Sequence, residues 1–288
     1  MNRRGFLAGL AGATGAAAIS SPLIAAPLAK VRETGFLRVG VYANNRPWSW
    51  ESGGKPAGID ADLARAIAEA LGVRADVALF SADEEVSDDL RNVVWRGGLL
   101  GFQRCDVMLH VPFDLEFAKQ EDKVVFVAPY YREDFTAICS AQTKNCDAPP
   151  QLFQGKRVAA ELDSIPDFYL VGGFGGILSN DVEHFSTGYE AALAVQTGGA
   201  DMAVATRAQI EAVIKDHPEA KGQLRKSPLP MIPSNGWDIG MAVKENSRSL
   251  GFAIEDVILE MTESGRMAEI FAAHGVAWEP ALAATPHS

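Results

Sequence analysis

The chain has 288 residues, of which 48% are hydrophobic and 22% charged, the composition of an ordinary folded protein. Its length is too great for one small core and suits two lobes. The net charge of −11 provides no basic excess to neutralise phosphates, which excludes nucleic acid as the main partner.

The N-terminus has the pattern of a bacterial export signal. Residues 2–7 contain adjacent arginines, as twin-arginine signals do, and a run rich in Ala and Gly follows. Small residues at 25–29 suit a signal peptidase, and Pro22 makes the run a poor membrane anchor. We therefore predict a twin-arginine signal at residues 1–29, a periplasmic location and a mature chain with no membrane span.

Strand and helix patterns alternate through the rest of the chain, which predicts an α/β protein with largely parallel sheets. The predicted strands, in order, are 37–43, 75–80, 105–110, 124–140 (broken at 130–134), 157–162, 182–185, 202–205 and 237–243. The predicted helices are 58–71, the first part of 87–100, one capped by Asp163-Ser164, then 188–196, 207–215, 250–261 and 267–274. Residues 44–47, with Asn-Asn and Pro, predict a loop after the first strand.

Two of these runs predict crossings between lobes. The extended run 124–140 is long enough to pass from one lobe to the next, and strand 237–243 can return. We therefore predict lobe 1 from residues 30–134 and 236–288, and an inserted lobe 2 from residues 135–235.

The three cysteines predict at most one disulfide. Cys139 and Cys146 enclose a short polar stretch, where a disulfide would brace the turn and add about 2 kcal/mol. Cys105 begins a strand and is expected to be a buried apolar residue rather than a nucleophile. No Cys/His group has metal-ligand spacing, so we expect neither a metal nor a cofactor.

The order of the elements carries a family resemblance. Together with the signature Gly58–Leu63 and the crossing Pro129-Tyr130-Tyr131, it resembles family 3 of the bacterial solute-binding proteins, over about residues 37–276. The resemblance implies the periplasmic-binding-protein type II fold, in which two α/β lobes joined by two strands close on a small ligand. It also implies a monomer and an ABC permease as partner.

A closer likeness points to a different partner. The segments Arg91–Gly97, Arg104–Met108, Val111-Pro112 and Pro129–Arg132 resemble the binding proteins associated with quinoprotein (methanol-type) dehydrogenases. That branch implies support of a periplasmic quinoprotein dehydrogenase or its cytochrome c. The chain departs from it at His110, where the branch has glycine.

The residues that hold an amino acid in family 3 are changed here. Asp114 stands where the family has a threonine, Phe117 where an arginine binds the ligand carboxylate, and Thr206 where an aspartate binds the ammonium. Losing one such desolvated contact costs roughly 2–5 kcal/mol. We therefore expect a small polar ligand that is not a standard amino-acid zwitterion. Arg132 could supply the missing cation or pair with neighbouring acidic residues.

The expected ligand residues follow from strand ends, helix starts and the resemblance. They are Asn45, Trp48, Asp60, His110, Val111, Asp114, Phe117, Tyr130, Asp163, Ser164 and Thr206. Each also has a structural interpretation: Asp60 can cap a helix, and Trp48 and His110 can simply pack.

Signatures of catalysis are missing from the sequence. It has no Gly-x-Ser-x-Gly elbow, P-loop or dinucleotide fingerprint, so we expect no enzyme. Asp60 and Asp114 could still form an acid–base pair, as in cyclohexadienyl dehydratase-like relatives. Three interpretations stay open besides that one: a binding protein of the quinoprotein branch, a dehydrogenase accessory without a small ligand, and an amino-acid ABC transporter binding protein.

Overall fold

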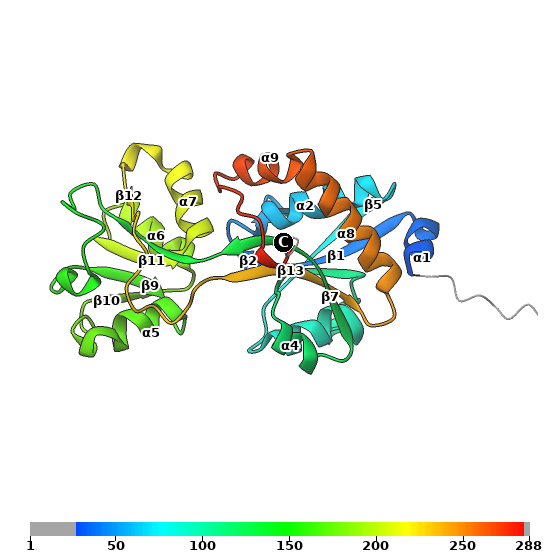
Figure 1. Cartoon of the computed structure of the whole chain (residues 1–288), viewed down its shortest axis with the longest axis horizontal. Helices are drawn as coiled ribbons and strands as arrows, with labels where there is room; N and C mark the ends of the chain where they lie inside the picture. The colour runs from blue at the N-terminus through cyan, green and yellow to red at the C-terminus, as the bar shows by residue number, and fades with distance from the viewer. Residues whose placement is uncertain (1–26, 285–288) are drawn as a thin grey trace, which may run out of the picture.

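The computed structural model describes residues 27–284, which form two α/β lobes side by side (Figure 1). We call the part built on the first five-stranded sheet lobe 1 and the part built on the second lobe 2. The predicted twin-arginine signal lies mostly outside the described residues. Its last residues, 27–29, begin helix α1 (Pro27–Thr34), where Leu28 packs against the core of lobe 1.

The sheet of lobe 1 has the strand order β5-β1-β6-β13-β7. Its strands are β1 (Phe36–Tyr42), β5 (Arg74–Phe80), β6 (Val107–Pro112), β7 (Val124–Glu133) and β13 (Trp237–Lys244). Strand β1 pairs parallel to β5 and β6, whereas β13 pairs antiparallel to β6 and β7. The chain therefore returns to the first sheet after lobe 2.

Apolar side chains cover both faces of this sheet. Val107 and Leu109 belong to the larger core, and Met108, between them on β6, belongs to a second cluster on the opposite face. Such alternation follows from the two-residue period of a strand. The elements that cover the faces are α1, α2 (Ile59–Ala70), α3 (Val86–Leu90), the π-helical turn η1 (Arg91–Trp95), α4 (Leu115–Gln120), α8 (Arg248–Glu263) and α9 (Arg266–Ala273).

The sheet of lobe 2 has the order β10-β9-β11-β8-β12. Its strands are β8 (Phe135–Cys139), β9 (Val158–Glu161), β10 (Val182–Phe185), β11 (Met202–Thr206) and β12 (Gln223–Leu224), and its helices α5 (Ile165–Gly172), α6 (Gly188–Gln196) and α7 (Arg207–Asp216). A disulfide joins Cys139 and Cys146.

A buried arginine connects the disulfide loop to the second crossing. Arg225 donates hydrogen bonds to the carbonyl oxygens of Cys146, Ala148 and Ser227 at 2.7–2.9 Å. Buried carbonyl groups need such donors, since an unpaired one costs about 1–3 kcal/mol. Arg225 therefore fixes the segment from which the chain leaves lobe 2.

The two crossings run side by side between the lobes (Figure 1). Only Asp134 separates β7 from β8, and Glu133 pairs with Trp237 at the start of β13. The first sheet uses strands within residues 36–133 and 237–244, and the second uses strands within 135–224. The domain limits 30–134, 135–235 and 236–288 stay a prediction.

Several local predictions were wrong. Residues 44–47 were predicted as a loop, but Asn44 and Asn45 form strand β2 of a small sheet, completed by β3 (Ser49–Ser52) and β4 (Lys55–Ala57), which were not predicted. Strand β7 continues through Tyr130–Glu133 without the predicted break, because β13 pairs with it there. By contrast, the helix predicted over the first part of 87–100 is present, as α3 followed by η1, and it ends before Gly97-Gly98. Within residues 27–284, no helix has the length and hydrophobicity needed to cross a membrane.

Candidate functional site

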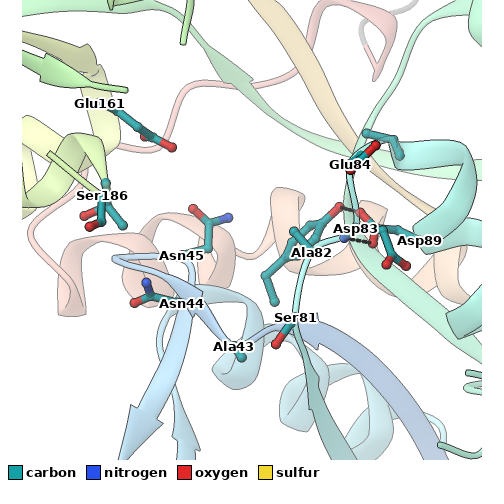
Figure 2. Close-up of a pocket in the computed structure, with 13 residues that line it drawn as sticks. Ala43, Asn44, Asn45, Ser81, Ala82, Asp83, Glu84, Asp89, Glu161 and Ser186 are labelled. Carbon is teal, nitrogen blue, oxygen red and sulfur yellow. Dashed lines mark hydrogen bonds between the residues drawn. The ribbon is translucent and has the colours of Figure 1, made fainter. Parts of the chain in front are cut away.

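A cavity of about 460 Å³ lies where the two lobes face each other. Figure 2 shows Glu161 and Ser186 of lobe 2 on one side, Asp83, Glu84 and Asp89 of lobe 1 on the other, and Asn44 and Asn45 between them. The complete lining is Tyr42, Ala43, Asn44, Asn45, Ser81, Ala82, Asp83, Glu84, Val86, Asp89, Glu161, Ser186 and Thr187. The volume suits one small molecule.

The lobe 1 wall is built at the carboxyl ends of two parallel strands. Tyr42 ends β1 and Phe80 ends β5, and the residues that follow each strand turn into the cavity. Asp89, buried on α3, holds this wall together: it accepts hydrogen bonds from the Tyr42 hydroxyl and the Asp83 N–H, each at 2.8 Å. Ligands bind at this end of open α/β sheets.

The lobe 2 wall has the same origin. Glu161 ends β9, and its carboxylate accepts a hydrogen bond of 2.8 Å from the N–H of Gly188, where α6 begins. Thr187 caps α6 through the N–H of Glu190 at 3.1 Å. The helix start therefore holds Glu161 in place, and Figure 2 shows its carboxylate directed toward Asn45.

Negative charge dominates the lining. It contains four carboxyl groups and no lysine, arginine or histidine. Burial raises the pKa of Asp89, although hydrogen bonds from Asp83 and Tyr42 oppose the shift. Burial also raises the pKa of Glu161, against the hydrogen bond from Gly188. Such carboxylates gain from a positively charged partner.

Of the eleven predicted ligand residues, only Asn45 lines this cavity. Four others form a cluster behind its wall. The carboxylate of buried Asp60 accepts a hydrogen bond from the Tyr130 hydroxyl at 2.7 Å and lies 3.4 Å from Nδ1 of His110. The His110 ring lies 4.7 Å from the buried Trp48 ring and 6.2 Å from Tyr42, measured between centroids. The cluster therefore supports Tyr42 from behind.

Three further predicted residues, on β6 and at the start of α4, have structural partners. Val111 is buried in the core, and the Asp114 carboxylate caps α4 by accepting a hydrogen bond from the N–H of Phe117 at 2.8 Å. The Phe117 ring lies 5.4 Å from that of Phe126. An aromatic contact thus stands where the family resemblance places an arginine.

The predicted residues of lobe 2 cap or flank the N-termini of helices. Ser164 caps α5 by accepting from the N–H of Asp167, and Thr206 forms a capping box with Gln209 at the start of α7. Asp163 has a left-handed backbone with φ of 58°, and its N–H donates to Asp167 at 3.1 Å. None of these three lines the cavity.

Arg132 does not pair with its acidic neighbours. Its guanidinium lies 3.1 Å from a carboxylate oxygen of Asp238 and donates to the carbonyl oxygen of Asn235 at 2.7 Å. From the sequence we expected either a free cation or a pair with adjacent residues, and Asp238 was overlooked. Because β13 runs antiparallel to β7, Asp238 lies opposite Arg132.

The carboxylates of the cavity were missed. Asp83, Glu84 and Glu161 share one signal, a position just after or at the end of a predicted strand, and Ser186 and Thr187 share it too, whereas Asp89 lies on α3. Ligand sites occur at such ends in parallel sheets. A search of the residues at all strand ends, and not only of the positions changed from the family pattern, would have found these residues but not Asp89.

One arginine connects the two lobes beside the cavity. The guanidinium carbon of Arg46 lies 4.7 Å from the ring centroids of both Trp50, in lobe 1, and Tyr189, in lobe 2. The guanidinium is also 3.2 Å from the carboxylate of Asp216, which accepts a hydrogen bond from the Tyr189 hydroxyl. Two cation–π contacts and one exposed ion pair together contribute about 1–2 kcal/mol.

Replacing Arg46 by alanine is therefore expected to weaken this connection. In the ligand-free protein, the Arg46→Ala variant should populate more widely separated lobes, with a larger radius of gyration by small-angle X-ray scattering. Arg65→Ala is the control, because Arg65 pairs with Asp62 inside lobe 1. An unchanged lobe separation in Arg46→Ala would contradict the interpretation.

Comparison with known proteins agrees with the fold. No family model matches the chain. A Chlamydia trachomatis (serovar D) protein named "Probable ABC transporter arginine-binding protein ArtJ" is 24% identical over 235 residues, 81% of this chain and 82% of that protein. An ancestral cationic amino acid solute-binding protein superposes with a TM-score of 0.67 at 20% identity, over 86% of this chain and 99% of that chain.

A third relative supports the same conclusion. A substrate-binding protein of an amino acid ABC transporter from Streptococcus pneumoniae, solved with L-arginine, has a TM-score of 0.63 at 17% identity, over 87% of this chain and 98% of that chain. The predicted fold class, two lobes of the periplasmic-binding-protein type II, is therefore confirmed. None of these three relatives is a quinoprotein-associated protein, so the closer likeness has no support from them.

Proposed function

We propose that the chain is an exported solute-binding protein that closes its lobes on a small polar solute and delivers it to an ABC permease of the amino-acid type. The observation that carries the proposal is the cavity between the lobes, lined by polar side chains from both. The relatives support it, since all three are named for binding amino acids or were solved with one, and two of them are named for an ABC transporter.

Each lobe would bind one side of the solute. Asn44, Asn45 and the loop 81–84 belong to lobe 1, and Glu161 with Ser186-Thr187 belongs to lobe 2. A solute that contacts both walls binds the closed state better than the open one, which shifts the population toward closure. The crossings at Asp134 and before Trp237 are where the chain would bend.

The test is binding with closure. The chain from residue 27 onward would be screened by thermal shift against amino acids, amines and organic acids, and hits measured by calorimetry and small-angle scattering. At a hundredfold excess over its dissociation constant, a bound solute should stabilise the protein by about 2.7 kcal/mol and reduce the radius of gyration. A screen in which no solute raises the melting temperature or closes the lobes would contradict transport binding.

A further inference from the structure

We infer that the solute is a small organic cation, an amine or a guanidinium compound, that carries no carboxylate beside its positive group. The inference rests on the proposed function, because it names the ligand class of the same cavity. Two features of the chain support it. The cavity is lined by carboxyl groups that can bind a cation, and the groups at the lobe boundary that could bind a carboxylate already have other partners.

The cavity offers negative charge from both lobes. Asp83, Glu84 and Asp89 line it from lobe 1 and Glu161 from lobe 2, and no lining residue is basic. Asp89 and Glu161 are held in place by hydrogen bonds from Tyr42 and Gly188. A cation between the walls would thus meet preorganised carboxylates on either side, which strengthens the closed state.

The same boundary already holds a guanidinium. Arg46 lines a hollow that shares Ala43, Asn44 and Thr187 with the cavity, and its guanidinium contacts the rings of Trp50 and Tyr189. Rings and carboxylates are the groups that bind organic cations. The cavity has the same kinds of group, an aromatic ring in Tyr42 and carboxylates, but no basic side chain lines it.

A carboxylate finds no comparable partner. The start of α4 is satisfied by the Asp114 carboxylate, and Phe117 packs on Phe126. The start of α5 is capped by Ser164 and flanked by the carboxylates of Asp163 and Asp167. A ligand carboxylate at either place would face like charge.

The arginines at the lobe boundary are committed elsewhere. The guanidinium groups of Arg132 and Arg207 pair with Asp238 and Asp134. Arg46 pairs with Asp216. A ligand carboxylate would have to break one of these pairs, and an amine does not need to.

The experiment compares matched pairs that differ only by the carboxylate. Calorimetry would measure agmatine against arginine, putrescine against ornithine and cadaverine against lysine, with glutamine as a neutral reference. We expect at least one decarboxylated compound to bind at least tenfold more tightly than its amino acid, and its affinity to fall as salt rises from about 50 to about 500 mM.

Variants locate the binding. Glu161→Gln and Glu84→Gln, one from each wall, keep the side-chain size and should each weaken binding of the best cation at least fivefold. Glu183→Gln is the matched control, since Glu183 is exposed on β10 and does not line the cavity. Circular dichroism and melting temperature check that the variants fold.

The outcomes separate this inference from the function it rests on. Tighter binding of arginine than agmatine, or of a neutral or anionic solute, would overturn the inference and leave solute binding intact. Equal losses in Glu183→Gln and Glu161→Gln would also overturn it. If the protein binds no solute and its lobes never close, both the inferred ligand class and the proposed function are contradicted.

Discussion

Replacing Gly58 by alanine is expected to destabilise the protein by about 4 kcal/mol or more. Gly58 has φ of 115° and ψ of 175°, a conformation essentially reserved for glycine. A Cβ there would lie 2.3 Å from the carbonyl oxygen of Trp48 and 2.9 Å from that of Pro47. Both oxygens are fixed, because they accept the N–H groups of Asp60 and Ile59 at the start of α2. The backbone must therefore move.

A second glycine provides the control. Gly72 has a positive φ of 75°, but no atom lies within 4 Å of the position that a Cβ would take, so Gly72→Ala should cost only the conformational strain of about 1 kcal/mol. Urea unfolding of both variants measures the difference in the free energy of unfolding. Equal losses would show that the contact with Trp48 is unimportant. The same turn fixes β3, which pairs with Asn44 and Asn45, so Gly58→Ala should also disturb the cavity.

Much of the fold could be predicted from the sequence because its strands are apolar on both faces. Val107, Met108 and Leu109 of β6 are successive residues on alternating faces and are all fully buried, and such a run has few other stable environments. The small sheet β2–β4 could not be predicted, since its strands are two to four residues long and mostly polar. Pairing across the hairpin, and not local pattern, defines them.

The candidate site was less predictable for a related reason. Asn45 was found because it follows an obvious strand, but Asp83, Asp89 and Glu161 come from three separate segments and from both lobes. Their convergence is a tertiary property. The family pattern also drew attention to Asp114 and Phe117, whose partners in the structure are a helix start and an aromatic ring. A residue that departs from the family pattern shows that a ligand contact of the family is missing. It does not show which residues of this chain bind the ligand instead.

The crossing between the lobes contains a buried carboxyl group. Glu133 is fully buried, and its carboxylate accepts from the N–H groups of Asp134 at 3.1 Å and Ala208 at 3.4 Å. Burial raises the pKa of Glu133 from its usual 4.5 to about 8, and these hydrogen bonds only partly oppose the shift. At neutral pH the folded protein therefore holds this group protonated, beside the ion pair of Asp134 and Arg207.

Replacing Glu133 by glutamine is expected to remove a penalty that grows with pH. Between pH 4.5 and 8 the unfolded chain ionises Glu133 while the folded protein keeps it neutral, so the unfolded state binds fewer protons and the free energy of unfolding falls as pH rises. Above about pH 8 the penalty levels off. Glutamine keeps an acceptor oxygen and cannot ionise, so the variant should gain on the wild type by on the order of 4 kcal/mol between about pH 4 and pH 8.

Urea unfolding from about pH 4 to pH 9 measures this gain as a difference between the two proteins. Glu263→Gln, a change at an exposed position of α8, controls for the general effect of removing one carboxylate. If the difference between Glu133→Gln and the wild type is constant across that range, the crossing does not hold a proton at neutral pH. A difference that rises with pH, absent from Glu263→Gln, means that deprotonation of Glu133 opposes the packed crossing, because the charge can be solvated only when the two strands and the start of α7 separate.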